Sequence, residues 1–107
     1  MEKRNLFSEE EITLCTYAAI YDAKDFGGLD KIHKIRLRKI GSIEMKIRNI
    51  ATMLDEKRIP RFNTKISPLT GLPPGKKGRM TNWDVVEKLY PLDKDAFLKM
   101  CKQIVKR

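Results

Sequence analysis

The sequence has few of the residues that build metal centres, secreted folds or membrane spans. Its 107 residues include two cysteines and one histidine, so the ligand count excludes a structural zinc site. No apolar run approaches the roughly 20 residues that span a bilayer, and Met1 to Asn5 lead into no apolar signal segment. We therefore expect a cytoplasmic protein that contacts no membrane and holds no cofactor. Cys15 and Cys101 lie in apolar patterns, which favours buried reduced thiols over a disulfide.

Sequence motifs typical of catalytic sites are missing as well. His33 is flanked by lysines, which favours a surface position near phosphate, and no Ser-His-Asp or Cys-His arrangement can be assembled around it. The carboxylates at Glu9 to Glu11 follow Ser8, a pattern typical of helix capping rather than acid–base chemistry. The glycine spacing and the strand–loop–helix context of a P-loop are absent around Gly75. We expect a protein that is not an enzyme.

Acidic residues are scarce in two blocks of the chain. Residues 31–48 hold seven Lys/Arg and one Glu, and residues 57–83 hold seven Lys/Arg and no acid. The whole chain has a formal net charge of +9. Neutralising phosphates with release of their counterions supplies most non-specific affinity for nucleic acids, so the partner predicted from charge is a polyanion.

The hydrophobic spacing predicts a small, mainly α-helical protein with residues 1–107 as one domain. A helix begins after Ser8, with Ser8 and Glu11 forming a capping box, and runs to about Asp22. Two helices follow at about 29–35 and 40–54, joined by a short turn. Residues 57–80 are a basic loop rich in Pro and Gly. Short extended pieces within it, at residues 59–66, could form a small wing. The segment 81–106 holds two C-terminal helices, the first capped by Thr81 with Trp83 turned inward, the second capped by Asp93.

Residues 29–54 predict a helix-turn-helix, the arrangement in which the second helix enters the major groove of DNA. One face of that helix is apolar, and it consists of Ile43, Ile47, Ile50, Ala51 and Leu54. A second stripe is mostly polar and basic, and it consists of Lys39, Ser42, Lys46, Asn49 and Met53. A cationic, amide-bearing outer face suits a recognition helix, whereas an ordinary solvated helix face is the alternative interpretation.

The segment Leu37 to Ala51 resembles a pattern in bacterial proteins of the HNH endonuclease type, where it belongs to an N-terminal helical domain that precedes the nuclease. The features in common are Arg38, the Gly41-Ser42-Ile43 triplet, Met45-Lys46 and Asn49, and the helix at 7–21 is similar to the opening helix of those proteins. Lys39-Ile40 departs from the small polar residues that the family prefers. The resemblance implies a DNA-binding or specificity module of restriction or mobile-element type. It does not imply a nuclease, because an HNH site needs two histidine roles.

The function predicted from these observations is duplex DNA binding without catalysis, with a nuclease or another protein as a further partner. Base or groove contacts are assigned to Lys39, Ser42, Lys46 and Asn49. Phosphate contacts are assigned to Arg36, Arg38, Arg48, Lys76, Lys77 and Arg79. Two alternatives stay open: a protein-interaction module whose basic face binds an acidic partner, and an RNA-binding protein. The aromatic content of 7% offers no evident stacking platform for RNA.

Overall fold

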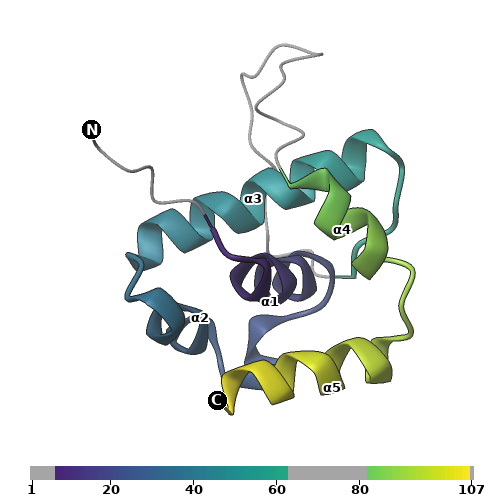
Figure 1. Cartoon of the computed structure of the whole chain (residues 1–107). Coiled ribbons are helices and arrows are strands. Elements are labelled where there is room, and N and C mark those ends of the chain that lie inside the picture. Colours follow the sequence, from purple (N-terminus) through teal and green to yellow (C-terminus); the bar gives the residue numbers. More distant parts are fainter. Residues whose placement is uncertain (1–6, 63–81, 107) are drawn as a thin grey trace.

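The protein is mainly helical, as the sequence predicts (Figure 1). A computed structural model describes residues 7–62 and 82–106, and these residues contain no β-strand. The helices, in chain order, are α1 (Glu9–Ile20), the 3-10 helix η1 (Ala23–Phe26), α2 (Leu29–Arg36), α3 (Ile40–Glu56), α4 (Trp83–Leu89) and α5 (Lys94–Val105). The part of the expected wing at residues 59–62 is not a strand, and the rest of it lies outside the described residues. None of the helices in the described part of the chain has the length and apolar character that a membrane crossing requires.

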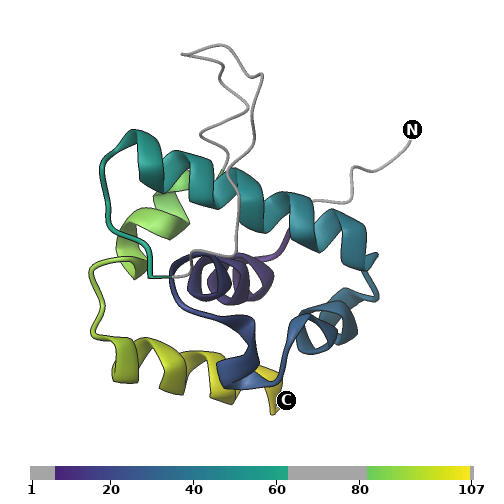
Figure 2. The same ribbon diagram turned by 180° about the vertical axis from the view of Figure 1, so that it is seen from behind.

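Helix α1 is the centre of the fold. Figures 1 and 2 show it end-on, between α3 on one side and α5 on the other, and it contacts α2, α3, α4 and α5. Every residue from Glu11 to Ile20 is buried, so the helix has no solvent-facing stripe over this stretch. The hydroxyls of its buried Thr13 and Thr16 donate to the carbonyl oxygens of Glu9 and Ile12, at 2.8 and 2.7 Å. These polar groups are therefore satisfied inside the helix itself.

The two ends of α1 follow different rules. The capping box is confirmed: the Ser8 hydroxyl accepts from the Glu11 N–H at 3.2 Å, and the Glu11 carboxylate accepts from the Ser8 N–H at 2.8 Å. The helix ends at Ile20, before the expected Asp22. The Asp22 side chain instead caps η1 by accepting from the N–H of Lys24 at 3.0 Å. An aspartate beside an open turn competes with helix continuation in this way.

Helices α2 and α3 occupy the segments that the sequence assigns to them, each extended slightly at its C-terminus. Three residues connect them, and Leu37 takes the left-handed conformation with φ 56°. The N-cap of α3 is Lys39, which forms no side-chain capping bond, in line with the lack of an N-cap signal in the turn. The expected inward face of α3 is confirmed, since Ile43, Ile47, Ile50, Ala51 and Leu54 are all buried.

The start of α4 differs from the sequence prediction, whereas the start of α5 agrees with it. The N-cap of α4 is Asn82, in the left-handed region at φ 68° and without a side-chain bond, where the sequence pointed to Thr81, which lies outside the described residues. Asp93 caps α5 as expected, accepting from the N–H of Asp95 at 3.2 Å. Met100 of α5 is 38% exposed. Phe97 and Cys101, one turn apart, are the buried residues of α5, and the centroid of the Phe97 ring lies 5.2 Å from that of Tyr17 in α1.

Both cysteines are buried free thiols, as expected. Burial raises the pKa of the Cys101 thiol to about 12 and raises the pKa of Cys15 further still. Tyr17, also buried, donates its hydroxyl to a carboxylate oxygen of Asp25 at 2.6 Å, which links α1 to η1. The core is thus closed by aromatic, aliphatic and thiol groups from every described helix.

Candidate nucleic-acid interface

The residues predicted to contact DNA fall into four groups. Arg36, Lys39 and Ser42 are exposed at the α2–α3 junction, and Arg48 and Asn49 are half-buried on α3. Arg38 and Lys46 are buried, at 6% and 9% exposure. Lys76, Lys77 and Arg79 lie outside the described residues. The structure therefore gathers one group at the start of α3 and turns a second group into the protein.

Arg38 is part of the fold rather than an open phosphate contact. Its Nε donates to Glu11 Oε2 at 2.7 Å and its Nη2 donates to Glu11 Oε1 at 3.0 Å, a bidentate pair with both side chains at most 5% exposed. The guanidinium also lies 3.8 Å from the centroid of the Phe7 ring. The expected phosphate role is a wrong assignment for this residue, because Glu11 takes up the fork that a phosphate would need.

Glu11 serves two structural purposes at once. Its burial tends to raise the pKa of the carboxyl, but hydrogen bonds from Arg38 and from the Ser8 N–H, together with the charge of Arg38, hold that pKa below its ordinary value. The carboxylate is therefore ionised at neutral pH and joins the N-terminus of α1 to the turn before α3. No local pattern in the sequence announces this pair, which spans 27 positions.

Lys46 is the second predicted contact that the structure turns inward. Its ammonium lies 5.6 Å from the centroid of the Phe7 ring, the same ring that the Arg38 guanidinium contacts. Burial, and then the positive charge of Arg38, lower the pKa of Lys46, while the nearby Cys15 acts in the opposite sense. The burial of Lys46 contradicts its assignment as a base contact.

The predicted polar stripe of α3 is not open to solvent along its whole length. Met53, its last member, is fully buried, and Thr52 beside it is 4% exposed. The Thr52 hydroxyl donates to the carbonyl oxygen of Arg48 at 2.9 Å. Residues 50–54 are buried in succession, so the helix is covered all round at this level. The members of the stripe that an outer ligand can reach are therefore Lys39, Ser42 and Asn49, all before residue 50.

His33 supports the turn from the α2 side. Its Nδ1 lies 2.6 Å from the carbonyl oxygen of Arg38, and because a carbonyl only accepts, Nδ1 is the protonated nitrogen. The ring is half-buried rather than fully on the surface, and its tie to the turn is a structural role that the sequence did not indicate. Within the described ranges 7–62 and 82–106, no cluster of His, Cys, Asp and Glu could hold a metal ion.

The start of α3 forms an open, positively charged surface, here called the basic corner: Arg36, Lys39, Ser42 and the first-turn backbone of α3. Its N-terminal turn contains no acidic residue and no capping side chain. The first N–H groups of a helix have no intrahelical acceptor, and they carry the positive end of the helix dipole. Residues 39–42 are all exposed, and a side chain at Gly41 would meet no atom within 4 Å. An anion can therefore approach these donors directly.

Three large apolar side chains are exposed next to the basic corner. Leu37 is 75% exposed, Met45 51% and Ile40 38%. The sequence placed Leu37 and Ile40 in a turn and assigned neither an outward nor an inward role. Their exposure gives the same region an apolar component that phosphate binding does not require.

Phe62 is the one strongly exposed aromatic side chain among the described residues, at 70%. Its ring stacks on that of Tyr21, with centroids 5.5 Å apart and an interplanar angle of 5°. Its N–H donates to the carbonyl oxygen of Ile20 at 2.7 Å, which holds the segment after α3 against the end of α1. The structure thus contains an aromatic platform that the low aromatic content did not lead us to expect.

Comparison with known proteins adds no relative: no family model matches the chain, and no curated protein or solved structure is significantly similar to it. The resemblance to HNH-associated domains thus stays a prediction from the sequence.

Proposed function

We propose that this protein binds duplex DNA without catalysis, with α2, its turn and α3 acting as a helix-turn-helix of restriction or mobile-element type. The observation that carries the proposal is the basic corner, where the uncapped N-terminus of α3 lies between exposed cations with no acid in the first turn. Phosphate oxygens are the anions that such donors bind best in a nucleic acid.

The structure reduces the set of contacts that this proposal uses. Arg36 would bind a phosphate, as the sequence predicts, and Lys39, which the sequence assigned to the bases or the groove, would bind a second phosphate at the helix start. Ser42 and Asn49 would face the groove. Arg48 is a flanking phosphate contact. Arg38 and Lys46 act behind this surface, by fixing the turn and supporting Phe7. Binding by this surface would be mostly electrostatic and only weakly sequence-specific, because few amide or guanidinium groups remain free to read bases.

A protein partner is the second candidate function, and one observation favours it. Leu37, Ile40 and Met45 expose apolar surface beside the cations, and Glu44 adds a carboxylate to the same helix. An apolar centre with a charged rim is the usual anatomy of a protein interface. A duplex partner gains little from the apolar side chains and is repelled by the carboxylate.

The test is binding of the full chain to random-sequence duplex DNA, followed by fluorescence anisotropy over a series of salt concentrations. Neutralising about five phosphates predicts a slope of log affinity against log salt near −4.5. Lys39→Ala should make the slope shallower by about 0.9, the share of one phosphate. Lys99→Ala is the matched control, because Lys99 is an exposed lysine of α5 and belongs to neither the basic corner nor α3.

Three results would overturn the proposal. Affinity that does not change with salt would remove the electrostatic basis. Equal losses for Lys39→Ala and Lys99→Ala would show attraction by overall charge rather than by the basic corner. Tighter binding to single-stranded RNA than to duplex, lost on Phe62→Ala, would move the function to the aromatic platform formed with Tyr21.

A further inference from the structure

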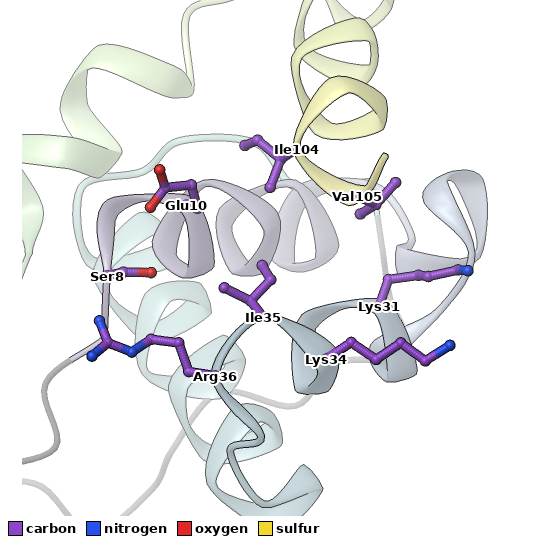
Figure 3. Close-up of a pocket in the computed structure, with 8 residues that line it drawn as sticks. All are labelled: Ser8, Glu10, Lys31, Lys34, Ile35, Arg36, Ile104 and Val105. Carbon is purple, nitrogen blue, oxygen red and sulfur yellow. The ribbon is translucent and has the colours of Figure 1, made fainter. Parts of the chain in front are cut away.

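A second surface, which shares only Arg36 with the basic corner, lies where α1 begins and where α2 and α5 end. It is a pocket of about 500 Å³ (Figure 3). Its lining residues are Ser8, Glu10, Lys31, Lys34, Ile35, Arg36, Ile104 and Val105. We call it the α1–α2–α5 groove.

The groove has an apolar floor. Ile35 of α2 and Ile104 of α5 point toward one another across it, with Val105 beside them (Figure 3). All three side chains are half-buried, so each keeps apolar surface open to solvent. No described element covers the rest of their surface, and an apolar side chain placed there would remove that surface from water.

The rim of the groove is cationic. Lys31 and Lys34 extend on one side and the Arg36 guanidinium lies on the other, against the single carboxylate of Glu10 (Figure 3). Lys34 also pairs with Asp30 at 3.6 Å, but both side chains are more than 60% exposed, so that pair leaves the ammonium available. The lining contains three cationic side chains and one carboxylate, so the rim is net positive around an apolar centre.

We propose that this groove binds a short acidic, amphipathic segment of a partner protein. An aliphatic side chain of the segment seats on Ile35, Ile104 and Val105, and carboxylates on either side of it meet Lys31, Lys34 and Arg36. The volume lies within the range of sites that take a few side chains of a ligand. Charge complementarity selects an acidic partner and the floor selects an apolar anchor. Duplex DNA offers the first and lacks the second, which makes a peptide the better match.

This inference does not rest on DNA binding, because Lys31 and Lys34 line the groove and are not part of the basic corner. Arg36 belongs to both surfaces. A test based on Lys31 and Lys34 can therefore fail or succeed without regard to the result at Lys39.

The experiment measures binding of the full chain to a short fluorescein-labelled peptide made of leucine and aspartate. One control peptide replaces leucine by serine, and a second replaces aspartate by lysine. The variant Lys31→Ala with Lys34→Ala should weaken binding of the first peptide about tenfold. The matched control, Lys88→Ala with Lys99→Ala, makes the same change in net charge outside the groove and should leave the affinity unchanged.

Methyl spectra of Ile35, Ile104 and Val105 report the location directly. Shifts of these methyl signals on addition of the leucine–aspartate peptide, and of neither control peptide, support the proposal. Equal binding of the serine control, equal losses for the two double variants, or unmoved methyl signals at saturating peptide would each overturn it. Stronger binding of a free fatty acid than of the peptide would likewise reject a protein segment as the occupant.

Discussion

Replacing Arg38 by leucine should destabilise the protein strongly, although arginine at this position looks like a surface cation in the sequence. The substitution leaves Glu11, which is fully buried, without its bidentate partner. Removing one member of a buried ion pair costs about 3–5 kcal/mol, because the remaining charge keeps its desolvation penalty. The stack on Phe7 at 3.8 Å is lost as well. The free energy of unfolding of a typical domain is about 5–15 kcal/mol, so the loss is a large share of the stability.

The assay is urea unfolding followed by circular dichroism, on the single variants and on Glu11→Leu with Arg38→Leu. The double variant should be more stable than Arg38→Leu alone, since it removes the buried charge together with its partner. It should stay below the parent protein by about 0.5–2 kcal/mol, because the Glu11 carboxylate no longer accepts the capping hydrogen bond from the Ser8 N–H. The coupling free energy from the cycle should exceed about 2 kcal/mol.

The pH dependence supplies a second, independent reading. In the parent protein the pKa of Glu11 is lower in the folded state than its ordinary 4.5, so the stability it contributes is present above that value and is lost as the pH falls through the lowered pKa. Without Arg38, burial raises the folded pKa of Glu11, and acid then stabilises the variant relative to neutral pH. The deficit of Arg38→Leu should therefore shrink between neutral pH and mild acid. A cost under about 1 kcal/mol, or additive single effects, would refute the buried pair and return Arg38 to the surface.

Three further outcomes are expected. Cys15 and Cys101 should react slowly with a thiol reagent in the native state, because burial excludes the reagent and raises both pKa values, and rapid labelling of both before unfolding would contradict the core. Ile47→Ala should lower the free energy of unfolding by about 2–5 kcal/mol, because Ile47 is buried. Asn49→Ala should instead leave the melting temperature nearly unchanged and reduce any sequence preference in DNA binding. The reverse pattern would mean that α3 is rotated about its axis. Glu44→Gln should tighten duplex binding without changing stability, because it removes an exposed carboxylate beside the basic corner; weaker binding would show that Glu44 contacts the ligand.

The sequence predicted the features that depend on neighbouring residues. The capping box at Ser8 and the apolar face from Ile43 to Leu54 follow from spacing alone, and the structure contains both. It mispredicted features that depend on remote partners. The spacing of Met53 matches the polar stripe, but Met53 is fully buried. Arg38 is buried only because α1 supplies a carboxylate from 27 positions away.

The groove and the aromatic platform escaped prediction for the same reason. Ile104 and Val105 belong to the apolar repeat of α5, and nothing in that repeat says that the last turn extends past the core to meet α2. Phe62 was read as part of an extended segment, while its position on Tyr21 depends on where the chain returns after α3. Pairings of this kind are set by tertiary packing, which local periodicity does not encode.

Arg38 is held at both of its ends, its guanidinium by Glu11 of α1 and its carbonyl by His33 of α2. The turn between α2 and α3 is therefore fixed by hydrogen bonds to two different helices. A ligand that docks on the first turn of α3 meets a surface whose shape was set when the chain folded, so little ordering entropy remains to oppose association. The same hydrogen bonds make the turn a poor hinge. Conformational change on binding is then expected outside the α2–α3 junction, and the free protein should already present the bound geometry there.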